Sequence, residues 1–278
     1  MTNGTILVTG GTGKTGAVLA ARLREAGVSV RIASRRASAG SDAAVFDWAD
    51  AATYGSALGG VDRVYLVAPT GDPNPERVMA PFLRRAVDAG VRRAVLLSSS
   101  AIPDGGPALG KVHQAVRELT PEWSVLQPSW FMQNFTTGQH GGTIKSGGGI
   151  ITAAGDGKVG FIDAADIAEA AFYALTDPLP HNKAHILTGP QALSYDEVAS
   201  VLSDAAGKTI RHVRISRAEL IARLTAFGIP PDYAALLADL EEAVQDGVED
   251  RVTGAVEEVT GRAPKSFAAF AQDNAGAW

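Results

Sequence analysis

The chain has 278 residues with 46% hydrophobic and 20% charged, a formal net charge of −5 at pH 7, and no cysteine. This charge gives no basic excess to hold a phosphate backbone, so no nucleic-acid partner is expected, and the missing cysteine excludes disulfides, a thiolate nucleophile and sulfur-ligated metals. No apolar run of membrane-spanning length and no leader pattern occur, so we expect a cytoplasmic protein that neither crosses nor binds a membrane.

Short apolar runs alternate with helical patterns through the first two-thirds of the chain. The alternation predicts an α/β fold, a Rossmann-type doubly wound parallel sheet, whose ligands lie at the carboxyl ends of the strands. The predicted strands are 5–8, 28–33, 43–46, 61–67, 91–97, 123–126 and 184–187, and the predicted helices are 15–26, 76–89, 111–119 and 163–175.

The pattern changes after Pro128. The glycine-rich segment 138–149 predicts a mobile loop, which is either a lid over the substrate or an inert surface loop. A capping box at Ser194 and the pair Pro230-Pro231 each predict the start of a helix. We therefore expect a smaller, mostly helical C-terminal substrate lobe. The expected boundaries are 1–135, completed by 161–189, for the Rossmann lobe, and 136–160 with 190–278 for the substrate lobe.

A glycine-rich turn follows the first strand and opens the first helix. It reads Gly10-Gly11-Thr12-Gly13-Lys14-Thr15-Gly16, with Gly10, Gly13 and Gly16 at every third position. Such a turn lets the backbone approach a pyrophosphate, which the helix N-terminus attracts. The phosphate loop of nucleoside triphosphatases needs a glycine where Val8 stands, and is excluded. The turn therefore predicts a dinucleotide site, and the contributing residues are Gly10, Thr12, Gly13, Lys14, Thr15 and Gly16.

The end of the second strand indicates which dinucleotide binds. A site for NAD usually has a carboxylate there, but this chain has Ser34-Arg35-Arg36. Arginine suits a 2′-phosphate, so Ser34 and Arg35 predict that NADP(H) is preferred over NAD(H), unless the arginines are merely solvated. Asp47 ends the third strand, where it can accept from the adenine amino group or cap a helix that starts at Ala49.

Several later segments resemble a known family. Together with the turn and Arg35, they resemble the NmrA-like branch of the atypical short-chain dehydrogenase/reductases, in the subgroup of the festuclavine and agroclavine dehydrogenases and their bacterial quinone oxidoreductase-like relatives. Gln127 departs from that subgroup, which usually has arginine there. The segments are Val67-Ala68-Pro69, Leu96-Leu97-Ser98-Ser99, Gly110-Lys111-Val112-His113, Leu126 to Phe135, Phe161 to Ala168, and Leu187-Thr188-Gly189-Pro190.

The resemblance implies transfer of a hydride from NAD(P)H to a small organic acceptor. That acceptor is expected to be an imine or iminium, an enone or a quinone. The resemblance also assigns Val67, Ala68 and Pro69 to the cofactor site. The alternative within the family is a non-catalytic regulatory protein that senses NADP(H). The oligomeric state is not predicted.

The usual proton donor of the superfamily is missing. Ordinary members use a tyrosine with a lysine four residues later, and none of the five tyrosines here has that lysine. For an iminium or a quinone, holding the hydride donor and the acceptor in contact can supply much of the rate without a proton donor. The remaining candidates are His113 as a proton donor, Lys111 as a hydrogen-bond donor to the nicotinamide ribose, and Ser98 or Ser99 as a hydrogen-bonding group for the substrate or the ribose. Their structural alternatives are a helix histidine without a role, a solvated lysine, and a serine that bonds strand-end backbone groups.

Aromatic residues follow the sixth predicted strand. Trp130, Phe131 and Asn134 are expected to bind the substrate, with Met132 and Phe135 in the same apolar wall. The alternative is that these side chains pack the core of the second lobe. Asp163 and Asp166 resemble a carboxylate pair, but their sequence is typical of a helix start. No metal-binding spacing occurs among the histidines, so no metal is expected.

Overall fold

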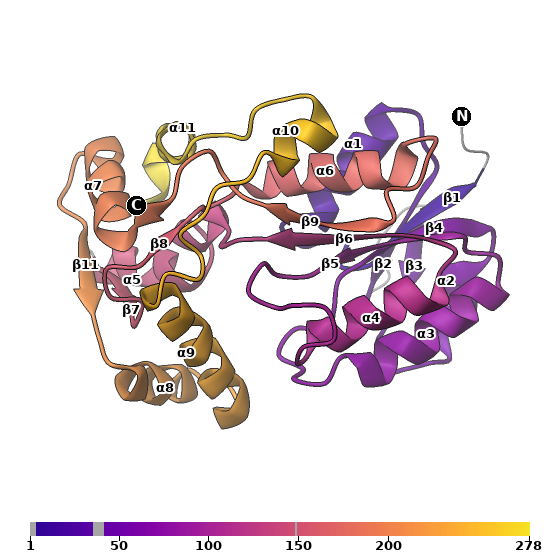
Figure 1. Ribbon diagram of the computed structural model, residues 1–278, viewed down its shortest axis with the longest axis horizontal. Coiled ribbons are helices and arrows are strands. Elements are labelled where there is room, and N and C mark those ends of the chain that lie inside the picture. Colours follow the sequence, from indigo (N-terminus) through magenta and orange to yellow (C-terminus); the bar gives the residue numbers. More distant parts are fainter. Residues whose placement is uncertain (1–3, 36–41, 148) are drawn as a thin grey trace. The chain divides into compact units, whose positions relative to one another are not determined.

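The computed structural model describes residues 4–35, 42–147 and 149–278, so Arg36 lies outside the described residues. The chain divides into two compact units (Figure 1). The first comprises residues 1–128 and 165–186, and the second comprises 129–164 and 187–278. Among the described helices, none is both long and apolar enough to cross a membrane.

The first unit is built on a seven-stranded sheet with the order β3-β2-β1-β4-β5-β6-β9. The pairs from β3 through β6 are all parallel, which confirms the predicted Rossmann-type α/β class. The strand order reverses between β1 and β4, and open parallel sheets bind their ligands at such a point. The strands are β1 (Thr5–Val8), β2 (Val30–Ser34), β3 (Ala43–Val45), β4 (Val61–Leu66), β5 (Arg93–Leu97), β6 (Glu122–Pro128) and β9 (Lys183–Leu187).

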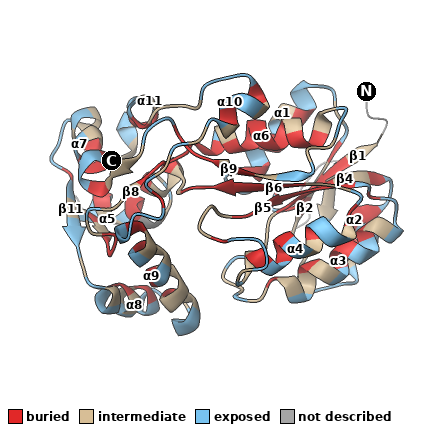
Figure 2. Cartoon of the chain, in the orientation of Figure 1, coloured by how far each residue is buried: buried red, intermediate tan, exposed pale blue. Residues whose placement is uncertain are grey.

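Helices cover both faces of this sheet (Figure 1). One face carries α1 (Gly16–Glu25) and α6 (Ala164–Thr176). The other carries α2 (Thr53–Leu58), α3 (Glu76–Asp88) and α4 (Leu109–Leu119). The helix predicted at 76–89 buries Met79, Phe82, Leu83 and Ala86 completely, as its apolar spacing requires (Figure 2).

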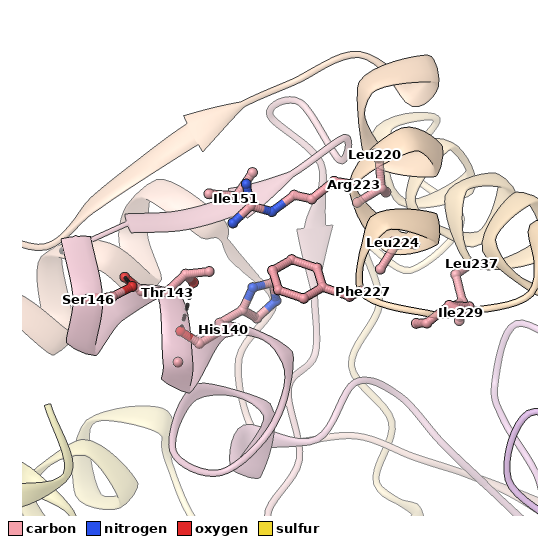
Figure 3. Close-up of a pocket in the computed structure, with 11 residues that line it drawn as sticks. His140, Thr143, Ser146, Ile151, Leu220, Arg223, Leu224, Phe227, Ile229 and Leu237 are labelled. Carbon is pink, nitrogen blue, oxygen red and sulfur yellow. Dashed lines mark hydrogen bonds between the residues drawn. The ribbon is translucent and has the colours of Figure 1, made fainter.

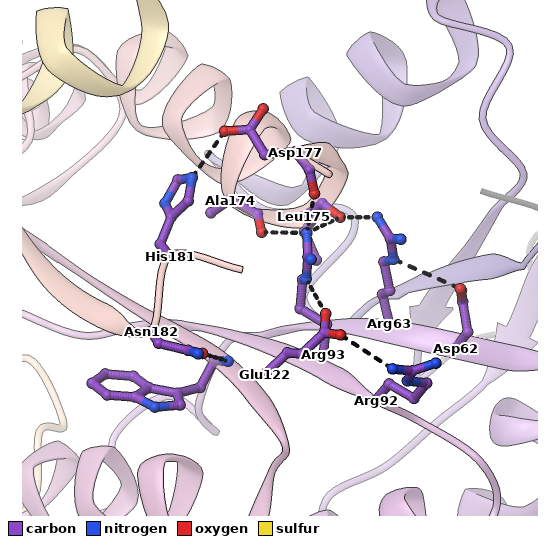
Figure 4. Close-up of polar contacts among 11 residues, drawn as sticks. Asp62, Arg63, Arg92, Arg93, Glu122, Ala174, Leu175, Asp177, His181 and Asn182 are labelled. Carbon is purple, nitrogen blue, oxygen red and sulfur yellow. Dashed lines mark hydrogen bonds and ion pairs between the residues drawn. The ribbon is translucent and has the colours of Figure 1, made fainter. Parts of the chain in front are cut away.

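Two arginines hold the carboxyl end of α6 (Figure 4). Arg93 is 2% exposed; its Nε lies 2.8 Å from Glu122 Oε2, and its Nη1 donates to the Asp177 carbonyl at 2.7 Å. Arg63 and Arg93 both donate to the Leu175 carbonyl. Cations and donors at a helix C-terminus satisfy carbonyls that have no partner within the helix. The two guanidinium groups therefore fix α6 to the sheet.

The second unit is mostly helical, as predicted. Its helices are α5 (Gln139–Gly147), α7 (Tyr195–Ala206), α8 (Arg217–Ala226), α9 (Pro231–Gln245), α10 (Ala255–Thr260) and α11 (Phe267–Asp273), with short turns at η1 (Met132–Phe135) and η2 (Ala275–Ala277). Its strands are β7 (Gly149–Thr152), which pairs with β11 (Arg211–Arg214), and β8 (Lys158–Val159), which pairs with β10 (Leu193–Ser194). The predicted capping box at Ser194 and the predicted helix start at Pro231 are both confirmed.

The loop predicted at 138–149 is wrong, because this segment forms α5 and the start of β7. Gly141 is buried, and a Cβ there would stand 2.2 Å from the Thr136 carbonyl oxygen. Ile144 is 1% exposed and packs in the core of the second unit. At Gly141 the glycine therefore permits close packing of a helix and does not indicate a flexible loop.

Candidate functional site

A groove of about 460 Å³ lies at the carboxyl ends of β1, β2, β3 and β4 in the first unit. This is the edge at which open parallel sheets bind ligands. Most of the residues predicted for the cofactor line it. They are Gly10, Thr12, Gly13, Ser34, Arg35, Asp47, Val67, Ala68 and Pro69.

Gly10 and Gly16 of the turn stand where a side chain would come too close to neighbouring atoms. Gly10 has φ +60°, and a Cβ there would lie 2.9 Å from Val67 Cβ. A Cβ at Gly16 would lie 2.3 Å from the Gly10 carbonyl oxygen. The Gly13 N–H donates to that same oxygen at 2.8 Å. The turn is therefore held tightly against the start of α1.

Buried hydroxyl groups anchor the turn to β4. Thr9 Oγ1 donates to the Tyr65 carbonyl at 3.0 Å and accepts from the Val67 N–H at 2.8 Å. The Tyr65 hydroxyl donates to Thr15 Oγ1 at 3.1 Å, and burial raises the pKa of Tyr65. The hydroxyl of Thr15 therefore has a structural partner. Neither Thr15 nor Gly16 lines the groove, and their predicted contacts with the cofactor stay predictions.

The N-terminus of α1 is suited to an anion. Its cap residue Thr15 makes no side-chain hydrogen bond to the helix, and no acidic residue stands in the first turn. The first N–H groups of a helix carry a partial positive charge. Lys14 is exposed and directly precedes Thr15 in the sequence. The predicted contact of Lys14 with the cofactor stays a prediction, because it does not line the groove.

Asp47 and Trp48 shape the groove beyond the turn. Asp47 Oδ1 accepts from the Ala49 N–H at 2.9 Å and so closes a turn, whereas the next helix begins only at Thr53. Trp48 Nε1 donates to the Val67 carbonyl at 3.1 Å, and its ring lines the groove. Trp48 was not among the residues predicted for the cofactor, although it directly follows Asp47, which was.

The three candidates for catalysis do not line this groove. Ser98 is 7% exposed, and its hydroxyl has no hydrogen-bond partner within the described residues. Lys111 is exposed, with its Nζ 3.7 Å from Glu76 Oε1. Their roles stay predictions.

His113 lies within α4 and is 4% exposed. Its ring centroid is 6.0 Å from that of Trp123, and its Nδ1 has no partner in the described part of the chain. Desolvation by burial lowers the pKa of His113, so its ring is neutral at pH 7. A neutral imidazole can still donate one N–H, but it is a weaker acid than an imidazolium.

The predicted substrate residues lie in the second unit. The Trp130 carbonyl accepts from the Ile162 N–H at 3.0 Å, and Phe131 forms a parallel bridge with Ile162. Trp130 and Phe131 are half-buried, whereas Met132 and Phe135 are fully buried in the core. Core packing is therefore the correct alternative for Met132 and Phe135. Asn134 is half-buried, and its N–H donates to the Phe131 carbonyl.

Two polar residues of the resembling segments have structural partners. Gln127 Nε2 donates to the Ile102 carbonyl at 2.9 Å and so holds the loop that follows β5. Asp163 Oδ1 accepts from Gln133 Nε2 at 2.9 Å, while Gln133 Oε1 accepts from the Ala164 N–H that begins α6. Asp163 thus helps to fix a helix start, as expected for this segment.

The NmrA-like family model matches residues 2–270. The uncharacterized oxidoreductase YesF of Bacillus subtilis is 50% identical over 275 residues, which cover 98% of this chain and 96% of that protein. The agroclavine dehydrogenase of Claviceps fusiformis is 41% identical over 99% of this chain and 98% of its own length. The crystal structure of the Escherichia coli NADPH-dependent quinone oxidoreductase QOR2 complexed with NADPH has a TM-score of 0.81 at 23% identity, over 96% of this chain and 99% of that chain.

The resemblance stated on the sequence is thus confirmed. The family model spans nearly the whole chain, and YesF is identical to it at half of the aligned positions. This chain belongs to the NmrA-like family and is an oxidoreductase of Rossmann type.

Proposed function

We propose that the protein is an NADPH-dependent reductase that transfers a hydride to a small organic acceptor. The acceptor class is an imine or iminium, an enone or a quinone. The groove at the switch point of the sheet carries this proposal, because it unites the glycine turn with Arg35 and Asp47. The 41% identity to an agroclavine dehydrogenase supports it further.

The chain's own residues fit a dinucleotide with a 2′-phosphate. The turn from Gly10 to Gly16 offers close backbone approach and a helix N-terminus to the pyrophosphate. Arg35 would bind the 2′-phosphate, since its planar fork matches phosphate oxygens. Asp47 and Trp48 would contact the adenine. The bound nicotinamide supplies the hydride.

Positioning is the main contribution that we assign to the protein. The chain has no tyrosine followed by lysine at the fourth position, which restricts the reaction to acceptors that need little help from an acid. An iminium carbon is already electrophilic, and a reduced quinone can take its protons from solvent. We propose Ser98, Lys111 and His113 as polar groups near the reaction, and Trp130, Phe131 and Asn134 as contacts of the acceptor.

The test is a titration of the purified protein with NADPH and with NADH, followed by nicotinamide fluorescence. The loss of reduced nicotinamide absorbance is then measured with a panel of quinones and cyclic imines. We expect Arg35→Ala to weaken NADPH binding about tenfold, which is about 1.4 kcal/mol, and to leave NADH binding within about twofold. Arg84→Ala removes an exposed arginine that does not line the groove, and should change neither affinity.

Equal affinity for NADPH and NADH would overturn the role of Arg35. Tight binding of NADPH without turnover of any panel member would contradict the reductase and favour a protein that senses NADP(H).

A further inference from the structure

A cavity of about 550 Å³ lies within the second unit (Figure 3). Segments from α5, β7, α8 and α9 form its walls. Its size is within the range of small-molecule sites, which is roughly 300 to 1,000 Å³. Leu220 and Leu224 also belong to a small buried core with Ala234 and Ala238, so the wall that α8 contributes is packed against α9. The apolar lining residues are Ile151, Leu220, Leu224, Phe227, Ile229 and Leu237.

His140 brings an unsatisfied polar group to this cavity. It is 3% exposed, its ring stacks on Phe135 with centroids 5.0 Å apart, and Figure 3 shows the ring directed toward Phe227. Neither ring nitrogen has a hydrogen-bond partner among the described residues. Burial lowers the pKa of His140 to about 3, so the ring is neutral and offers one donor and one acceptor. Because His140 lines the cavity, a ligand there can form a hydrogen bond with its ring.

Arg223 brings a positive charge to the same cavity. Its guanidinium carbon lies 5.6 Å from the centroid of Phe227. No carboxylate pairs with Arg223 in the part of the chain that the structure describes, whereas Arg217 on the same helix pairs with Asp239 at 2.9 Å. The lining contains no aspartate or glutamate. The positive charge of Arg223 therefore favours an anion as the ligand of this cavity.

Phe227 indicates the other part of the ligand. It is 73% exposed, which is a large apolar surface for a residue at the rim of an apolar cavity. A flat ring bound beside it would cover this surface and also stack against the Arg223 guanidinium.

We infer that this cavity is a binding site for an aromatic organic anion, in which the ring system lies among Leu224, Phe227 and Ile151 and the carboxylate or sulfonate binds Arg223. His140 donates a hydrogen bond to a second polar group of the ligand. This site is additional to the proposed reductase activity and does not depend on it, because its lining includes none of the residues proposed above for the cofactor or the acceptor.

The experiment uses two probes that differ in one anionic group. These are 1-anilinonaphthalene-8-sulfonate and the uncharged N-phenyl-1-naphthylamine, whose fluorescence rises in apolar surroundings. The full-length protein is titrated with each. Two glycines of α5 provide matched variants, because a Cβ at Gly142 or at Gly147 meets no atom within 4 Å. Gly142 lines the cavity and Gly147 does not.

We expect Gly142→Phe to fill the cavity and abolish binding of both probes, while Gly147→Phe binds both like the unmodified protein. Arg223→Gln should weaken binding of the sulfonate probe at least tenfold and change the affinity for the uncharged probe by less than about twofold. Circular dichroism and the NADPH titration on the same variants show whether each one is folded.

Three results would overturn the inference. The first is equal binding of the sulfonate probe by Gly142→Phe and the unmodified protein. The second is a loss of probe binding in Gly147→Phe that equals the loss in Gly142→Phe. The third is an equal effect of Arg223→Gln on the binding of both probes. If the unmodified protein failed to bind NADPH, the proposed function would fail, while the probe results would still decide this inference.

Discussion

The glycine at the start of α1 allows a sharp test of the cofactor turn. In Gly16→Ala the new Cβ would stand 2.3 Å from the Gly10 carbonyl oxygen and 3.0 Å from Gly11 Cα. Real Cβ atoms essentially never approach closer than 3.0 Å. Both obstructing atoms are backbone, so the turn must move away from the helix by several tenths of an ångström.

The size of the effect follows from this clash. Overpacking of a tight contact costs about 1–3 kcal/mol, and the better helix propensity of alanine offsets up to about 1 kcal/mol of that. We expect a net loss of about 1 kcal/mol in the free energy of unfolding. A displaced turn also loses hydrogen bonds to the pyrophosphate, each worth about 1.5–3 kcal/mol, so NADPH affinity should fall tenfold or more.

The assay combines an NADPH titration with urea unfolding of Gly16→Ala. Gly55→Ala in α2 is the matched control, because a Cβ there meets no atom within 4 Å. The control should gain about 0.5–1 kcal/mol of stability and bind NADPH normally. If Gly16→Ala bound NADPH as tightly as the unmodified protein, the turn would not be the pyrophosphate site.

Three further predictions concern buried polar groups. Tyr65→Phe removes the hydroxyl that donates to Thr15 Oγ1, so calorimetry should show a melting temperature about 2–4 °C lower, and no change would argue against that bond. Glu122→Gln removes the carboxylate beside buried Arg93, and urea unfolding should show a loss of about 3 kcal/mol; a loss below about 1 kcal/mol would mean that the carbonyl acceptors suffice. His140 has its folded pKa, about 3, below that of the unfolded chain, so the unfolded chain binds the proton first and stability is lost as the pH falls from about 6.5 toward 3. His140→Phe should therefore lose less stability than the unmodified protein between pH 7 and pH 4, and parallel pH profiles would refute this reasoning.

The sheet and the cofactor turn could be predicted because their signals are local. The run Thr5–Val8 is apolar on both faces, as in a strand covered on both sides. The glycine spacing of the turn that follows occupies only seven residues. The predicted strands and helices of the first unit match the structure to within about two residues at each end.

Features made by distant segments escaped prediction. Local composition at 138–149 indicates a loop, but this segment contains a helix whose Ile144 packs in a core made by distant parts of the chain. The cavity of the second unit unites residues from His140 to Leu237, and no local pattern shows which helix faces meet. Trp48 reaches the groove because its indole binds the Val67 carbonyl, which is a contact across two strands.

The interleaving of the two units constrains the order in which the protein can fold during synthesis. Strand β6 ends at Pro128, but β9, its neighbour in the sheet, leaves the ribosome only after residues 129–164 of the other unit have been made. During that interval one edge of β6, including its buried Val125 and Leu126, lacks a partner. An unpaired apolar edge is a template for pairing with another chain. Nascent chains stalled before Lys183 should therefore depend on chaperones far more than the completed protein does.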